Sequence, residues 1–190
     1  MNRREALNMV TLLMGGAVVG GTAFLEGCKT ADKKSVAALP LTKEQIAFLD
    51  EVAETIIPTT STPGAKAAKV GEFMNTMVVD CYEEKDQKVF LEGLSKIDEG
   101  AQAAFKKDFM SITPEQRKEL LSKTDTEAVA YAKSKKPEDP AHYFSLMKQL
   151  TLLGFFTSEV GATKALRYVA VPGKYEGCVP YKKGDKAWAT

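Results

Sequence analysis

The feature that most constrains this fold is the helical spacing of apolar residues along nearly all of the chain after residue 41. Two segments begin with a capping box, in which the Thr42 and Thr113 side chains accept from backbone amides and Gln45 and Gln116 reach back. Apolar residues recur behind each box every three to four positions, which marks one face of an α-helix. No segment of convincing length has the period of a strand. The pattern predicts an all-α fold, a compact bundle of about five to six helices with an irregular C-terminal tail.

Proline, capping and turn-forming residues indicate where each expected helix begins and ends. Pro58 ends the first one, and the turn-rich loop at residues 59–64 is interpreted as a structural connection between two core helices. The helix behind Thr113 is expected to break near Thr124 and to restart at a cap formed by Asp125. The most apolar segment, at residues 142–157, predicts the central helix. Further helices are expected at 65–82, at 84–107 and, as a continuation or restart of the central helix, at 158–169.

Residues 1–28 have the three parts of a signal peptide: a basic start, an apolar middle of about 17 residues and small residues at the cut. Arg3 and Arg4, with Leu7 three positions on, are similar to the twin-arginine signal that carries folded proteins across a membrane. An ordinary secretory peptide with two positive charges is the alternative. The twin-arginine route is favoured because Leu7 stands where that signal requires an apolar residue.

Cys28 stands where the apolar stretch ends, and residues 25–28 (LEGC) are similar to a lipoprotein cleavage box. The small Gly27 admits the peptidase and the Cys28 thiol accepts the lipid, although Glu26 is unusual at its position. The alternative is a soluble protein that is cut elsewhere. We therefore expect a lipid-anchored protein on the periplasmic side of the cell envelope, with a tether at 29–41 and a single helical domain at 42–190.

Export would place Cys81 and Cys178 in an oxidising compartment. A disulfide between these two residues, a disulfide from one of them to a partner chain, and two unpaired thiols with Cys81 buried in a helix face all remain open. Spacing alone cannot choose among them, because a disulfide requires a specific three-dimensional separation.

The residue inventory argues against catalysis by this chain. The net charge is +1, from 26 basic and 25 acidic residues, which indicates no nucleic-acid partner. His142 is the only histidine, so no histidine cluster can hold a metal, and no nucleotide, haem or hydrolase motif is present. His142 as a base beside Glu138 or Asp139 is weighed well below a position at a helix start. No catalytic, cofactor-binding or metal residue is therefore assigned.

Three segments together resemble the gluconate 2-dehydrogenase subunit 3 family. The most specific is residues 48–60 (FLDEVAETIIPTT) followed by 62–65 (TPGA). The others are residues 155–162 (FFTSEVGA) and the tail at 168–180, so the likeness spans about 42 to 180.

The resemblance implies a non-catalytic small subunit that escorts, stabilises and membrane-anchors a flavoprotein dehydrogenase. That partner would be of the glucose-methanol-choline type, hold FAD, oxidise a sugar or sugar acid, and in some complexes work with a cytochrome c subunit. A free-standing exported lipoprotein that binds another partner is the alternative. In the tail, Tyr175, Cys178, Tyr181 and Trp188 are candidate docking residues, because aromatic side chains anchor interfaces. A strap across the chain's own helices is an equal alternative for the tail.

Overall fold

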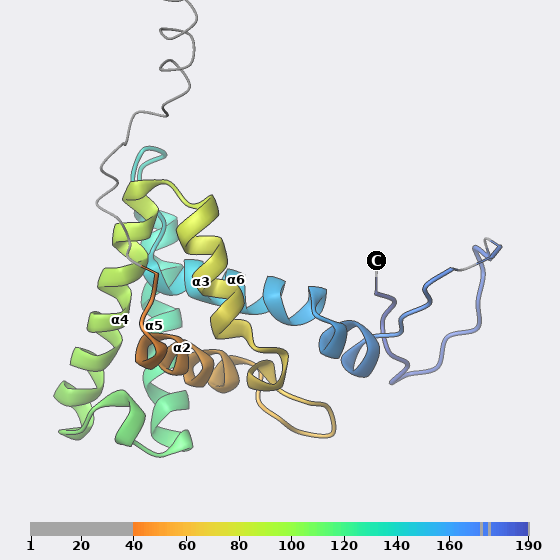
Figure 1. Ribbon diagram of the computed structural model, residues 1–190, viewed down its shortest axis with the longest axis horizontal. Helices are drawn as coiled ribbons and strands as arrows, with labels where there is room; N and C mark the ends of the chain where they lie inside the picture. The colour runs from red at the N-terminus through yellow and green to blue at the C-terminus, as the bar shows by residue number, and fades with distance from the viewer. Residues whose placement is uncertain (1–39, 172, 175, 190) are drawn as a thin grey trace, which may run out of the picture. The chain divides into compact units, whose positions relative to one another are not determined.

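The computed structural model describes residues 40–171, 173, 174 and 176–189, and Figure 1 traces them from α2 to the C-terminal segment. Several predictions made above lie outside the described residues: the signal peptide with Cys28, residues 29–39 of the tether, and Tyr175. The helices are α2 (Lys43–Ile56), α3 (Val70–Cys81), α4 (Glu84–Phe105), α5 (Pro114–Ser134) and α6 (Tyr143–Thr157). Three short turns accompany them: η1 (Ala65–Ala68), η2 (Phe109–Ser111) and the π-helical η3 (Gly161–Ala165).

The all-α prediction is confirmed for the described part of the chain, where the only β pairing is an isolated bridge between Arg167 and Trp188. Both capping boxes are formed. Thr42 Oγ1 accepts from Gln45 N at 3.2 Å, and Thr113 Oγ1 accepts from Gln116 N at 3.3 Å. None of these described helices is long and apolar enough to span a membrane.

The core confirms α6 as the central helix, because α6 packs against α2, α3, α4 and α5. Its Met147, Leu150 and Phe155 are buried, as are residues on every neighbouring helix. The buried neighbours include Leu49 and Val52 on α2, Met74 and Val78 on α3, Phe90 and Ile97 on α4, and Leu121 on α5. Burial of these side chains supplies the main driving force for folding.

The expected break in the helix after Thr113 is wrong, because α5 runs without interruption from Pro114 to Ser134. Thr124 is buried and donates its hydroxyl to Leu120 O at 3.0 Å, which satisfies it inside the helix. Asp125 does not act as a cap. Its carboxylate pairs with Lys148 of α6 at 2.8 Å instead.

Two other boundaries differ from the prediction. The segment from residue 65 begins as the 3-10 turn η1, and Lys69 adopts a left-handed conformation (φ 53°) before α3 starts at Val70. The last helix is a single π turn that ends at Ala165 rather than at 169. At Gly161 a Cβ would collide with Phe155 O, so glycine permits this tight restart.

Candidate functional site

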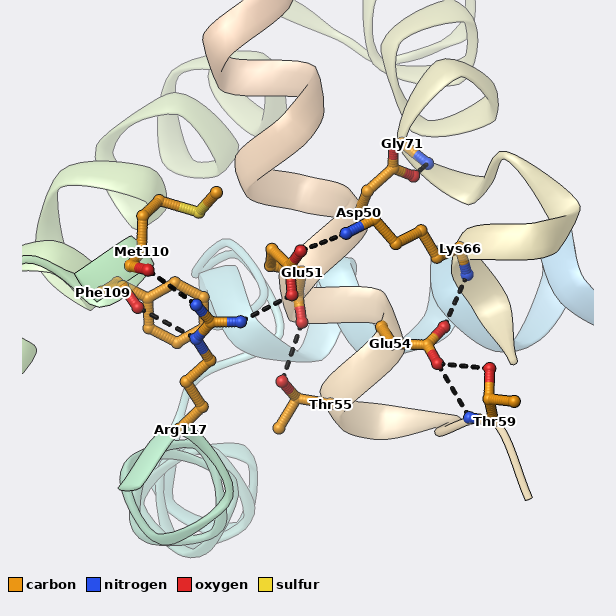
Figure 2. A network of polar contacts seen from close by, with 10 residues as sticks. All are labelled: Asp50, Glu51, Glu54, Thr55, Thr59, Lys66, Gly71, Phe109, Met110 and Arg117. Atoms are coloured by element: carbon orange, nitrogen blue, oxygen red, sulfur yellow. Dashed lines mark hydrogen bonds and ion pairs between the residues drawn. The ribbon is translucent and has the colours of Figure 1, made fainter. Parts of the chain in front are cut away.

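The motif at residues 48–65 places three carboxylates, Asp50, Glu51 and Glu54, along α2, and Figure 2 shows their contacts with other parts of the fold. We call these three residues and their partners the α2 clamp. It involves α5, the η2 turn, the loop at 59–64 and the start of α3. Its contacts decide what the motif does.

Glu54 fixes the loop after α2. Its carboxylate accepts from Thr59 N at 2.8 Å, from Thr59 Oγ1 at 2.7 Å and from Lys66 N at 2.9 Å (Figure 2). Burial acts to raise the pKa of Glu54, but these hydrogen bonds and the charge of Lys66 outweigh it and the pKa is lowered. Gly64 lies so close that a Cβ there would collide with the Glu54 carboxylate. The interpretation of this loop as a structural connection is therefore confirmed.

Glu51 joins α2 to α5 through Arg117, whose Nη1 lies 2.6 Å from Glu51 Oε2, and it also pairs with Lys66. The same guanidinium donates from Nε to Phe109 O at 3.0 Å and from Nη2 to Met110 O at 2.7 Å. It also lies 5.4 Å from the centre of the Phe109 ring. Because the Arg117 and Glu51 side chains are only 13% and 19% exposed, this pair is well shielded from water.

Asp50 caps a helix to which it does not belong. Its Oδ1 accepts from Gly71 N at 2.8 Å, an amide in the first turn of α3 that has no partner within that helix. Burial raises the pKa of Asp50, and the hydrogen bond from Gly71 opposes this only in part. A Cβ at Gly71 would lie 2.6 Å from Ile46 O, so the close approach of α3 to α2 requires glycine.

The α2 clamp therefore acts structurally: its charges are used to hold segments together. Sequence spacing does not predict the pairing of Glu51 with Arg117, because the two residues are 66 positions apart. The sequence feature that could have indicated this network is the group of three acidic residues, Asp50, Glu51 and Glu54, in the most specific part of the motif. Among the described residues, no group of three or more His, Cys, Asp or Glu could hold a metal ion.

His142 lies at the start of α6, as the preferred interpretation expected. Its Nδ1 accepts from Phe144 N at 3.3 Å, and its ring lies 4.3 Å from Tyr143 and 5.7 Å from Tyr131. Burial, and secondarily the charge of Lys96, lowers the pKa of His142. The neutral ring is therefore favoured, and it is the neutral Nδ1 that can accept the capping hydrogen bond.

Cys81 and Cys178 are free thiols in the structure, and both are exposed. Of the alternatives left open for these residues, a Cys81 buried in a helix face is wrong, because Cys81 is the last residue of α3 and is exposed. The structure contains no bond between Cys81 and Cys178.

Exposed apolar side chains gather in the C-terminal third of the described chain. Leu152, Leu153 and Phe156 on α6 are 41–44% exposed, and we call them the α6 strip. Helical spacing places these positions on neighbouring sides of α6. Beyond η3, the exposed apolar residues are Tyr168, Val169, Val171, Val179, Tyr181 and Trp188. Exposed apolar side chains that lie together are candidates for a protein interface.

The tail at residues 166–189 forms a closed loop, which we call the C-terminal loop. Arg167 N donates to Ala187 O at 2.8 Å, and Ala189 N donates to Arg167 O at 2.9 Å. Of the candidate docking residues, Tyr181 and Cys178 are exposed within the loop, whereas Trp188 lies at its base, 4.6 Å from the Arg167 guanidinium. Outside itself, the loop has described polar contacts only with η3, from Leu166 N to Gly161 O and from Lys186 Nζ to Lys164 O, which does not support a strap across the helices.

Comparison with known proteins gives one family. The sequence model described as gluconate 2-dehydrogenase subunit 3 matches residues 43–173. The match includes the α2 clamp and the α6 strip and ends inside the C-terminal loop. No curated protein and no solved structure matches the chain.

Proposed function

The chain belongs to the gluconate 2-dehydrogenase subunit 3 family, and from this we propose that it is the non-catalytic small subunit of an exported flavoprotein dehydrogenase. It escorts, stabilises and membrane-anchors a large subunit of the glucose-methanol-choline type that oxidises a sugar or sugar acid. In this proposal the FAD belongs to that large subunit. The present chain contributes a binding surface, the export signal and the membrane anchor.

The α6 strip is the observation that carries the docking part of this proposal. α6 is the central helix, yet Leu152, Leu153 and Phe156 leave it partly exposed. Large apolar side chains at the middle of a contact, surrounded by polar residues, are typical of protein–protein interfaces. A partner that covers this strip removes apolar area from water and stabilises both chains.

The α2 clamp supports this role from within the domain. Interfaces lose less free energy to ordering when the binding surface is rigid before the partner arrives. The clamp joins α2 to α5 and to the start of α3, and α6 packs against all three helices. A rigid frame behind the α6 strip follows from these contacts.

Export and anchoring complete the proposal, and they rest on the sequence of residues 1–28. A flavoprotein that folds around FAD before export needs a route for folded cargo, which the twin-arginine signal at Arg3 and Arg4 provides. A lipid on Cys28 then holds the complex at the periplasmic side of the membrane. One small chain thus supplies both the signal and the anchor.

The decisive experiment is recovery of the full chain, affinity-tagged, from detergent-solubilised native membranes. We expect a yellow flavoprotein to co-purify, and flavin absorbance per chain measures it. The double variant Leu152→Glu/Leu153→Glu should lose most of this flavin. The matched control Met110→Glu/Val129→Glu also alters two exposed apolar residues, away from α6, and should retain it.

Two results would contradict the proposal. Wild-type protein that purifies without flavoprotein would favour the free-standing lipoprotein. Equal flavin recovery from the α6 variant and its control would show that the α6 strip is not the docking surface.

A further inference from the structure

We propose that the C-terminal loop is a pre-organised recognition element, in which Arg167, Asp185 and Trp188 hold a basic, apolar surface ready for an acidic-rimmed apolar site on the flavoprotein subunit. This surface, which we call the tip, consists of Val171, Tyr181, Lys182 and Lys183. This inference rests on the proposed function and adds to it a second contact and the chemistry of the partner's surface. We call the three residues the loop clasp.

The loop clasp closes a segment of about twenty residues with several contacts at one point. Two backbone hydrogen bonds, at 2.8 and 2.9 Å, join Arg167 to Ala187 and Ala189. The Arg167 guanidinium lies 4.6 Å from the centre of the Trp188 ring and 3.9 Å from Asp185 Oδ2. Lys186 adds a bond from Nζ to Lys164 O. These contacts offset part of the entropy that closing such a loop costs.

A turn beside the clasp fixes the chain at residues 182–185. Asp185 N donates to Lys182 O at 3.0 Å, and Asp185 Oδ2 accepts from Lys182 N at 2.9 Å. Gly184 has φ +98°, the left-handed conformation that the third position of a type II turn requires. Because Asp185 belongs to both the turn and the clasp, the clasp controls where the neighbouring side chains lie.

The charge of this region indicates the chemistry of its partner. Residues 161–190 contain six basic residues and two acidic ones, a net charge of +4, whereas the whole chain carries +1. Within the loop as described, Lys174 pairs with Glu176 at 2.5 Å, but Lys182 and Lys183 make no ion pair. Unpaired lysines beside an apolar tip are complementary to an acidic rim, which speeds association and fixes orientation.

The apolar part of the tip is the most exposed in the described chain. Val171 is 80% exposed and Tyr181 is 76% exposed. An anionic lipid surface is the other ligand class with this chemistry, but segments that bind it carry about four to eight clustered cations. Here Lys186 Nζ is bonded to Lys164 O, and Arg167 lies on the only tryptophan and near Asp185. Lys182 and Lys183 are therefore the two loop cations without a described side-chain partner. A shaped protein site fits these observations better than a bilayer does.

The test uses the flavoprotein that the full-length wild-type chain itself recovers from membranes. Lys182→Glu/Lys183→Glu should lower flavin recovery about three- to tenfold at low salt and reduce its dependence on ionic strength. The control Lys43→Glu/Lys107→Glu makes the same charge change at two exposed lysines of the helical domain and should recover flavin normally.

Trp188 tests the clasp as a positioning device. Trp188→Ala should lower flavin recovery about three- to tenfold, whereas Trp188→Phe should restore most of it, because a ring remains under the guanidinium. Trypsin should cleave after Lys182 and Lys183 faster in Trp188→Ala than in wild type. The thermal unfolding of the helices should stay unchanged, because Trp188 lies outside the core.

The outcomes separate this inference from the proposed function. Recovery of no flavoprotein by the wild type overturns both. Recovery by the wild type that the loop variants do not alter overturns the inference alone, as does equal recovery by Trp188→Ala and Trp188→Phe. Loss of binding to vesicles of equal phosphatidylglycerol and phosphatidylcholine, with flavin recovery intact, would assign the loop to lipid and overturn it as well.

Discussion

Replacing Arg117 by alanine removes a side chain that joins α5, the η2 turn and α2. The guanidinium makes three hydrogen bonds, to Glu51 Oε2 at 2.6 Å, Phe109 O at 3.0 Å and Met110 O at 2.7 Å. The variant leaves a carboxylate that is 19% exposed without one of its two cationic partners and two carbonyls without this donor. The expected consequence is a large loss of stability, since unsatisfied shielded polar groups keep their desolvation cost.

The magnitude follows from the burial of the pair. Removing one partner of a fully buried ion pair costs about 3–5 kcal/mol. In the variant Lys66 still pairs with Glu51, and water can partly reach the site. We therefore expect the free energy of unfolding to fall by about 2–4 kcal/mol. For a domain of this size that corresponds to a fall in Tm of roughly 4–16 °C.

The assay is urea and thermal unfolding of the Cys28→Ala chain, followed by circular dichroism. Lys148→Ala is the matched control, because Lys148 and Asp125 also form an ion pair between helices but are 41% and 36% exposed. It should cost less than about 1 kcal/mol. A double-mutant cycle of Glu51→Gln with Arg117→Ala should show coupling, because in the double variant neither the Glu51 carboxylate nor the Arg117 guanidinium is left without the other. An Arg117→Ala variant no less stable than the control would refute this reasoning.

Four further predictions concern other parts of the chain. Gly71→Ala should destabilise by about 1–3 kcal/mol in the same unfolding assay, because its Cβ would lie 2.6 Å from a backbone carbonyl of α2; an unchanged Tm would contradict this. The folded state lowers the pKa of Glu54, so its contribution is fully present above the unfolded pKa and is lost as pH falls through the folded value. The protection factors for hydrogen exchange at residues 59–66 should therefore fall in acid in the wild type and become insensitive to this step in Glu54→Gln. Cys28→Ala should release the protein from membranes into the soluble periplasmic fraction, and retention would rule out the lipid anchor. Arg3→Lys with Arg4→Lys should keep the chain and its flavoprotein inside the cell, and normal export would rule out the twin-arginine route.

The helices themselves could be predicted from the sequence because their determinants are local. A capping box such as the one at Thr42 and Gln45 needs contacts only three residues apart. The apolar spacing behind each box predicted which face is buried, and the apolar character of residues 142–157 predicted the central helix, which the contacts of α6 confirm. Proline and glycine predicted an irregular tail for the same local reason.

Only the tertiary structure decided what the polar residues of the motif do. Glu51 meets Arg117 across 66 positions, and Asp50 caps α3 from another helix, so neither partner could be chosen from spacing. The uninterrupted α5 also depends on a long-range contact, because Asp125 pairs with Lys148 of α6 and does not cap a local amide. The sequence determined where helices start and which side chains avoid water, since those preferences act over one or two turns. The long-range pairs, and the closing of the tail at Arg167, exist only once packing has brought distant segments within hydrogen-bond reach.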